Sequence, residues 1–274
     1  MSNRVATAVI TGGSSGIGLK FAETLAERGY NLVLMAREEN KLNQVCHDLA
    51  GRYDIEVQPV VADLADRDSV ERLAKLIGQT KNLAYMINNA GFAIHVDADD
   101  NSRAAHDLQR DAVDIMALNV LLFSSAAASV MKKQKCGRII NIASTAAWTF
   151  QGNYSAIKRY VLTYTQGLAL SLEGTGVTAT AICPAWMHTN FHRAAGLDEP
   201  AIPEWLYVRP DQVVQQGLAG ADKGRRVVVP TVRWKMIIWI LAHGPVALRR
   251  QWTRVYLGSG NYKRRKSRRK RSKK

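Results

Sequence analysis

The sequence has few cysteines and no long uninterrupted apolar run. Its 274 residues include three cysteines, Cys46, Cys136 and Cys183, which stand far apart and form no CxxC pair. This spacing argues against a zinc site and a disulfide framework, so we expect reduced thiols, no metal and a cytoplasmic protein. Near the C-terminus the longest strictly apolar run is Met236–Ala242. It is far shorter than the ~20 residues of a membrane-spanning helix, and we expect no transmembrane anchor.

The N-terminus lacks the pattern of a secretion signal, because an apolar strand pattern begins only a few residues after Met1. Acidic residues are outnumbered by basic ones, which gives a formal net charge of +15. Ten of the 12 residues in 263–274 are Lys or Arg, and the rest of the chain has 28 basic and 23 acidic residues. The body of the protein is therefore only mildly basic, and any affinity for anionic partners belongs to the tail.

Apolar strand patterns alternate with helical patterns through residues 5–92, and the same order continues to Val229. The strands are nearly continuous apolar runs, as expected where helices cover both faces of a sheet. This order predicts an α/β fold with a doubly wound parallel sheet of the Rossmann type, in a single domain with a helical C-terminal extension. Long helices are expected from about Asp111 to Lys133 and from about Tyr154 to Leu172.

The expected organisation has three parts. Residues 1–231 form the catalytic domain, 232–262 a helical arm that Pro245 should divide in two, and 263–274 a disordered polybasic tail. Within the first part, the segment 184–210 contains four prolines and several aromatic residues, which indicates an irregular lid with a short helix.

A glycine-rich turn follows the first predicted strand and precedes an apolar-periodic helix. The turn reads Thr11-Gly12-Gly13-Ser14-Ser15-Gly16-Ile17-Gly18. Glycines let the backbone turn tightly and approach a pyrophosphate, while the helix N-terminus offers unpaired N–H groups and partial positive charge. A plain strand-to-helix turn is the alternative, but the strand, turn and helix context favours a dinucleotide site.

Arg37 stands at the end of the second predicted strand, where NAD-binding sites carry an acidic residue for the ribose 2′-hydroxyl. A guanidinium cannot accept that hydrogen bond, but it can hold a 2′-phosphate with two parallel bonds. We therefore expect NADP(H) to be preferred over NAD(H), with Lys41 assisting from the next helical turn. The alternative is that Arg37 is a solvated loop residue.

Tyr154 and Lys158 are spaced i, i+4 at the start of a predicted helix, so they share one face. A cation held near a phenol favours the phenolate and lowers the pKa of the phenol, so Tyr154 is the expected general acid or base and Lys158 its tuner. Ser144 ends a strand, where a hydroxyl can donate to a substrate oxygen as charge develops on it. Chance occurrence of the YxxxK spacing and a turn role for Ser144 are the alternatives.

These residues resemble the short-chain dehydrogenase/reductase family over roughly residues 4–230. The resemblance rests on motifs in the family's order and approximate spacing: TGGSSGIG at 11–18, Asp63-Leu64, Asn88-Asn89-Ala90-Gly91, Asn119, Ser144, Tyr154 with Lys158, and Pro184 with Thr189. It implies a Rossmann-type fold and an NAD(P)-dependent oxidoreductase. Family members often form dimers or tetramers through the two long helices, so a homo-oligomer is also implied.

The resemblance further implies roles for individual residues. Asp63 would contact the adenine, Asn89 would support the cofactor and the central strand, Asn119 would hold a water in a proton relay, Lys158 would also bind the nicotinamide ribose, and Thr189 would bind the carboxamide. Further cofactor contacts are implied for Leu64, Ala90, Gly91, Tyr154 and Pro184.

Two features depart from the family pattern. Ser144 and Tyr154 are ten residues apart, about three fewer than the family leads us to expect, so the loop between them must be tight. Thr145 is therefore an alternative source of the substrate hydroxyl contact. The glycine that usually follows the proline is replaced by Ala185, which removes backbone freedom where the chain enters the lid.

An apolar substrate pocket is expected from Ser144, Trp186, Phe191 and Trp205, although the same aromatic residues equally suit a cover over the sheet. The predicted function is NADP(H)-dependent interconversion of a ketone or aldehyde and the corresponding alcohol. The alternative is a non-catalytic NADP(H)-binding sensor or scaffold.

The C-terminal stretch is expected to be a packing arm or subunit contact followed by a disordered tail. A second hypothesis is attachment to a membrane surface, in which the Trp-rich segment 232–257 lies in the interface and the tail meets anionic lipid. No aromatic residue is interleaved in the tail and no recognition motif is evident, so no specific nucleic-acid binding is expected.

Overall fold

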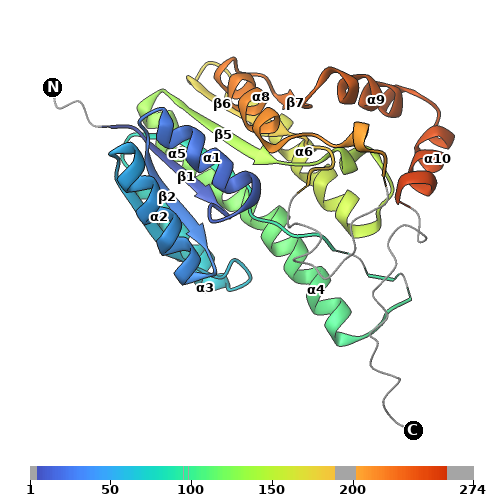
Figure 1. The fold of residues 1–274 in the computed structure, drawn as a ribbon, viewed down its shortest axis with the longest axis horizontal. Coiled ribbons are helices and arrows are strands. Elements are labelled where there is room, and N and C mark those ends of the chain that lie inside the picture. Colours follow the sequence, from blue (N-terminus) through green and yellow to red (C-terminus); the bar gives the residue numbers. More distant parts are fainter. Residues whose placement is uncertain (1–4, 95, 98, 189–201, 258–274) are drawn as a thin grey trace, which may run out of the picture.

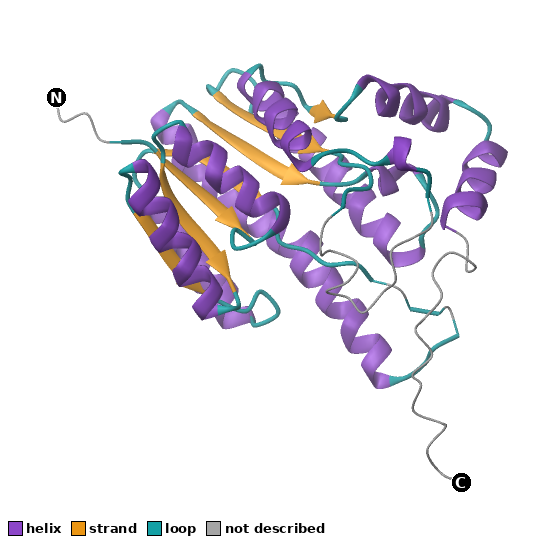
Figure 2. Cartoon of the chain, in the orientation of Figure 1, coloured by secondary structure: helices purple, strands orange, loops and turns teal. Residues whose placement is uncertain are grey.

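The computed structural model describes residues 5–94, 96–97, 99–188 and 202–257, with the backbone alone for 256 and 257. Within these residues, seven parallel strands form one sheet in the order β3-β2-β1-β4-β5-β6-β7 (Figures 1 and 2). The order reverses between β1 and β4, which is where doubly wound sheets bind ligands beyond the carboxyl ends of their strands. The expected fold class is confirmed.

The strands are β1 (Thr7–Thr11), β2 (Asn31–Ala36), β3 (Val57–Val61), β4 (Leu83–Asn88), β5 (Gly137–Ile142), β6 (Val177–Ile182) and β7 (Val227–Val228). Strands β1, β2, β4, β5 and β6 are almost wholly buried, because helices cover both faces of the sheet. This two-sided cover is the physical reason that their sequences are continuous apolar runs rather than alternating ones.

Two helical layers enclose the sheet. One layer consists of α1 (Gly16–Glu27), α2 (Glu39–Tyr53) and α8 (Pro210–Asp222), and the other of α3 (Arg67–Gln79), α5 (Asn119–Gln134) and α6 (Gly152–Ser171). Helix α1 contacts both α2 and α8, while α3 packs against α5. The main apolar cluster packs α1, α2 and α8 on the strands and also includes Val120 of α5 and Val161 and Leu162 of α6. A second cluster packs α3 and α5 on the strands.

The long central helix starts earlier than the sequence predicts. It begins as α4 (Arg103–Val113) and runs through a π-helical turn, Asp114–Leu118, into α5. The expected start at Asp111 is therefore wrong, because Ser102 caps the helix by accepting a hydrogen bond from the backbone N–H of Ala105 at 3.2 Å. The run 103–134 is long and apolar enough to cross a membrane, but half of its most apolar window is buried, as in the core helix of a water-soluble fold.

A chain of buried polar side chains ties the sheet to the helices that carry the site. The amide of Asn88 donates to Asn141 Oδ1 at 2.8 Å and to Ser124 Oγ at 3.1 Å, and the amide of Asn141 donates to Thr165 Oγ1 at 2.9 Å. These bonds join β4, β5, α5 and α6 in the buried interior, where Asn88 Oδ1 accepts no hydrogen bond from the described residues.

Two helices follow β7 at the far edge of the sheet. They are α9 (Val232–His243) and α10 (Val246–Leu257), and Pro245 separates them as predicted. Figure 1 shows both beyond β7, at the opposite side of the protein from α2 and α3. Trp234 of α9 is only 1% exposed and belongs to the main apolar cluster, so this part of the C-terminal arm packs on the domain.

Candidate active site

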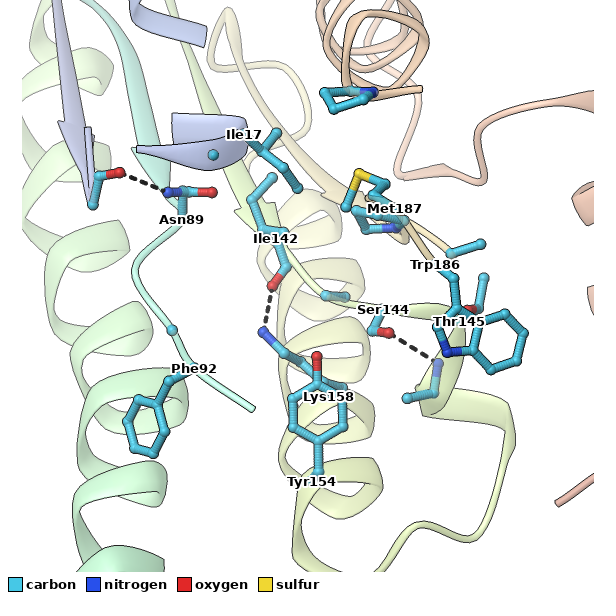
Figure 3. A pocket seen from close by; sticks show the side chains of 18 of the residues that line it. Ile17, Asn89, Phe92, Ile142, Ser144, Thr145, Tyr154, Lys158, Trp186 and Met187 are labelled. Atoms are coloured by element: carbon cyan, nitrogen blue, oxygen red, sulfur yellow. Dashed lines mark hydrogen bonds between the residues drawn. The ribbon is translucent and has the colours of Figure 1, made fainter. Parts of the chain in front are cut away.

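A cavity of about 860 Å³ opens at the carboxyl ends of the central strands. Its walls come from the glycine-rich turn after β1, the ends of β4, β5 and β6, the first turns of α6, and the inner sides of α9 and α10. Figure 3 shows how segments from both halves of the chain face one another across it. This is the place where a parallel doubly wound sheet binds ligands.

The glycine-rich turn forms one wall of the cavity. Gly12, Ser15, Gly16 and Ile17 line it, while Thr11, Ser14 and Gly18 support the turn from behind. Gly12 and Gly16 adopt φ angles of +68° and +55°, which favour glycine. A Cβ on Gly18 would stand 2.1 Å from the carbonyl oxygen of Gly12, so only glycine lets α1 approach the turn this closely.

Thr11 and Asn89 clamp the ends of β1 and β4 together. The amide of Asn89 donates to the carbonyl oxygens of Thr11 and Gly12 at 3.0 and 3.2 Å. The hydroxyl of Thr11 accepts the backbone N–H groups of Asn89 and Ala90, each at 3.0 Å. The clamp fixes the turn, and Asn89, Ala90 and Gly91 line the cavity.

The turn fits the diphosphate of a dinucleotide. Helix α1 has no acidic side chain in its first turn, and its N-cap Ser15 makes no capping bond through its side chain. The first N–H groups of the helix therefore remain available to an anion in the cavity. A dinucleotide held here would have its diphosphate over Gly16 and Ile17, and its nicotinamide toward α6.

Of the residues predicted for the adenosine end, Lys41 lines the cavity, whereas Arg37 and Asp63 do not. Arg37 follows β2 and is exposed, whereas Glu38 and Lys41 line the cavity. Asp63 is exposed and accepts the backbone N–H of Ala65 at 3.0 Å, and Leu64 is buried. The structure therefore places Arg37 and Asp63 on the surface beside the ends of β2 and β3.

Tyr154 and Lys158 occupy the first turns of α6, and both line the cavity. Lys158 is 5% exposed, its ammonium donates to the carbonyl oxygen of Ile142 at 3.0 Å, and Nζ lies 5.8 Å from the ring centre of Tyr154. Burial lowers the pKa of Lys158 to about 8. The nearby Cys183 thiol supplies no counter-charge, because burial raises its pKa to about 12. Figure 3 shows the Tyr154 hydroxyl pointing into the cavity.

Ser144 follows β5 and begins a short 3₁₀ turn, Thr145–Trp148. This turn is how the chain accommodates the short Ser144 to Tyr154 spacing. Ser144 Oγ accepts the backbone N–H of Ala146 at 3.1 Å, so its own hydrogen stays available for donation. Thr145 is buried and also lines the cavity, with its backbone N–H bonded to Pro184 O at 2.9 Å. Both candidate hydroxyls therefore stand at the same wall.

Asn119 does not line the cavity. It is buried directly after the π-helical turn, and its amide donates to the carbonyl oxygen of Leu64 at 2.7 Å. That bond connects the long helix to the segment after β3. The side chain is thus placed behind the site, in a supporting position.

The substrate side of the cavity differs from the expected set. Pro184 and Trp186 line it, but Trp205 is 52% exposed and is not among the lining residues. Thr189 and Phe191 lie outside the described residues. The prediction for Trp205 is wrong because it belongs to a 3₁₀ turn, Glu204–Leu206, in which Leu206 is the buried member.

Sequence reasoning missed the wall that the C-terminal helices provide. Trp234, Ile238 and Leu241 of α9 and Trp252 of α10 line the cavity. Trp234 lies between Trp186 and Trp252, with ring centres 5.5 and 6.1 Å apart, and its indole N–H donates to Leu206 O at 3.0 Å. The i, i+4, i+7 spacing of the three α9 residues is the signal that could have found this face.

Within the described ranges, no group of three or more His, Cys, Asp or Glu side chains is arranged to hold a metal ion. The polar groups at the cavity wall include the hydroxyls of Ser144, Thr145 and Tyr154, the amide of Asn89 and the ammonium of Lys158. Glu38, Lys41 and His188 also line the cavity.

Comparisons with known proteins match both the sequence and the fold. A model of the short chain dehydrogenase family matches residues 6–200. A Streptomyces violaceoruber protein named as a ketoacyl reductase of the granaticin polyketide synthase is 31% identical over 263 residues, covering 93% of each chain.

Two solved structures share the architecture. A short-chain dehydrogenase from Sphingobium yanoikuyae in complex with NADPH has a TM-score of 0.78 and 28% identity, over 85% of this chain and 92% of that chain. The bulky-bulky ketone specific alcohol dehydrogenase from Comamonas testosteroni has a TM-score of 0.74 and 27% identity, over 85% of this chain and 90% of that chain.

Proposed function

The chain belongs to the short-chain dehydrogenase/reductase family, as an oxidoreductase that interconverts alcohol and carbonyl groups with NAD(P), and from that premise we propose its finer chemistry. It prefers NADP(H) over NAD(H), acts on an apolar ketone or aldehyde and its alcohol, and uses Tyr154 as the general acid and base. The observation that carries the proposal is the convergence of Tyr154, Lys158 and Ser144 in the cavity that the glycine-rich turn lines.

The chain's own residues manage the proton and the developing charge. When bound, the nicotinamide supplies the hydride that reduces the carbonyl carbon. Tyr154 donates its phenolic proton to the carbonyl oxygen, so that the alcohol forms and a phenolate remains. The buried ammonium of Lys158 favours that phenolate. The hydroxyl of Ser144 or Thr145 donates to the same substrate oxygen, and in the alcohol-oxidising direction Tyr154 takes the proton back.

The coenzyme preference rests on the charges near the end of β2. Arg37 is exposed outside the cavity wall, so its guanidinium can bind the 2′-phosphate of a coenzyme at the rim of the cavity. Lys41 adds a second cation from α2. The related Sphingobium structure is a complex with NADPH, which agrees with this assignment.

The substrate class rests on the apolar wall opposite Tyr154. This wall offers large apolar surfaces, and the indole N–H of Trp234 is already bonded to the carbonyl oxygen of Leu206. Its residues are Trp186, Trp234, Ile238, Leu241 and Trp252. Such a wall favours a bulky apolar group on the carbonyl. The similar Comamonas enzyme is described as bulky-bulky ketone specific, and the Streptomyces relative as a ketoacyl reductase, so a substrate panel should contain bulky ketones and β-ketoacyl thioesters.

Replacing Tyr154 tests the proposal. We expect Tyr154→Phe to lower kcat by a factor on the order of 10²–10⁴, since it removes the proton donor, while the Kd for NADPH stays nearly unchanged. Tyr160→Phe is the matched control, because Tyr160 lies on the same helix outside the cavity. Turnover of the substrate panel is measured as the rate of NADPH oxidation. Undiminished turnover in Tyr154→Phe would refute the role of Tyr154.

A further inference from the structure

Helix α9 is apolar on two opposite sides, and the protein covers only one of them. Trp234, Ile238 and Leu241 face inward and are buried. The other side, which we call the outer face of α9, consists of the exposed residues Val232, Met236, Trp239 and Ile240, with Trp239 65% exposed. A helix that is apolar around most of its circumference belongs in a core or in contact with a membrane. Within the described part of the chain, nothing buries the outer face.

The charged residues that follow Asp222 in the sequence all have one sign. Residues 223–274 contain 18 Lys and Arg and no Asp or Glu. Among them, Lys235 on α9 and Arg250 and Arg254 on α10 are exposed. An exposed tryptophan and exposed aliphatic side chains, on a segment whose charged residues are cations alone, match the chemistry of an anionic bilayer surface, which is apolar below its headgroups and negative at them.

We propose that the outer face of α9 docks the protein on an anionic lipid bilayer. Val232, Met236, Trp239 and Ile240 enter the headgroup region, while the exposed cations Lys235, Arg250 and Arg254 meet the anionic lipids. Figure 1 places α9 and α10 at one edge of the protein, so the outer face can reach a flat surface without moving the domain. Because the inner side of the same helix walls the cavity, docking places that cavity next to the bilayer.

A second copy of the chain fits this face less well than a bilayer does. A symmetric contact through the outer face of α9 would bring the exposed Lys235 of both copies close together. No acidic residue in 223–274 is present to compensate these charges. The like charges would therefore oppose such a contact, whereas anionic lipid headgroups neutralise them.

Vesicle co-sedimentation of the full chain tests the proposal. The probe is phosphatidylcholine vesicles with a minority of phosphatidylserine, and the variant is Met236→Glu/Trp239→Glu. Because both side chains are exposed, the fold should be kept, and we expect the partition coefficient to fall by about tenfold or more. The control is Val61→Glu, which introduces a single glutamate at a 49% exposed apolar residue of β3, on the opposite edge of the sheet, and should bind as the wild type does.

Two further measurements separate the possible occupants. Brominated lipid should quench tryptophan emission in the wild type, and Trp239→Phe should bind vesicles but lose most of that quenching. Wild-type partitioning in the double glutamate variant would show that the basic tail alone binds lipid, and would overturn the proposal. The proposal would also be overturned if the wild type did not bind vesicles and the double glutamate variant had a smaller sedimenting mass. That result would assign the outer face of α9 to subunit contact.

Discussion

The ammonium of Lys158 occupies a site that disfavours its charge. Its pKa falls from the ordinary value of 10.5 to about 8, chiefly because burial removes water from the ammonium. We expect Lys158→Met to abolish turnover but to raise the free energy of unfolding at pH 7 by about 1–2 kcal/mol, since the buried charge disappears. Chemical denaturation monitored by circular dichroism measures the change.

The pH dependence of this difference has a defined sign. Between about pH 8 and pH 10.5 the unfolded chain binds the proton on Lys158 more tightly than the folded protein does, so the wild type gains stability with rising pH there. The advantage of Lys158→Met should therefore shrink across that window. Lys20→Met is the control, because acidic neighbours raise the pKa of Lys20 and its loss should not stabilise the protein. A less stable Lys158→Met at pH 7 would contradict the argument.

Arg37 offers a test of the coenzyme preference. Arg37→Asp removes the proposed 2′-phosphate contact and adds an acceptor for a ribose hydroxyl, so the Kd for NADPH should rise at least about tenfold and that for NADH should fall. Titration of both coenzymes by tryptophan quenching measures the two constants. Arg52→Asp makes the same charge change at the other end of α2 and should alter neither. Equal changes in the two Kd values for both substitutions would show that Arg37 acts through the net charge of the protein and not through contact with the 2′-phosphate.

Close backbone packing at α1 makes Gly18 the most sensitive point of the glycine-rich turn. In Gly18→Ala, the added methyl group would meet the Gly12 carbonyl oxygen at 2.1 Å and Asn89 Nδ2 at 2.4 Å. We expect a loss of about 1–3 kcal/mol in the free energy of unfolding and weaker NADPH binding, because the turn must shift. Gly51→Ala in α2 meets no atom within 4 Å and should leave stability unchanged or raise it by up to about 1 kcal/mol. Thermal unfolding with and without NADPH compares the two.

The elements that sequence predicts well are those whose signals are local. Buried parallel strands appear as apolar runs, and the turn at 11–18 and the i, i+4 pair Tyr154 and Lys158 depend on neighbouring residues alone. Ala105, Leu108 and Ala112 have helical spacing in α4, but they stand among charged and polar residues, so the start of the helix escaped. The capping Ser102 was its clearest mark. Helix boundaries of this kind need the cap to be weighed as heavily as the period.

The substrate side could not be predicted because it depends on how distant segments fold back. The stripe Trp234, Ile238 and Leu241 fits a helix packed on any apolar surface, and only the return of the chain after β7 turns it toward Tyr154. Trp205 shows the opposite error. It was expected to line the pocket because it is an aromatic residue of the expected lid, but it is 52% exposed. Spacing identifies an apolar face, but tertiary structure decides what that face contacts.

The single folded chain exposes a second set of apolar side chains to water. They lie on the long helices and not on α9. Leu118, Leu122, Tyr160 and Leu170 are exposed along α5 and α6. The two helices lie side by side, as the hydroxyl of Tyr164 donates to the carbonyl oxygen of Leu121 at 3.3 Å. Exposed apolar residues gathered on neighbouring helices are typical of subunit contacts, which agrees with the homo-oligomer that the family resemblance implies.

We therefore expect the wild type to sediment as an oligomer, and Leu118→Glu/Leu122→Glu to sediment as a monomer at micromolar concentration. The two leucines are one helical turn apart on the outside of the long helix, so the added carboxylates would face each other across a symmetric contact and repel. Analytical ultracentrifugation measures the masses, and Val61→Glu should keep the wild-type mass. Because Tyr154 and Lys158 point from α6 into the cavity, away from this surface, the monomer should retain NADPH binding, which separates loss of assembly from loss of the site.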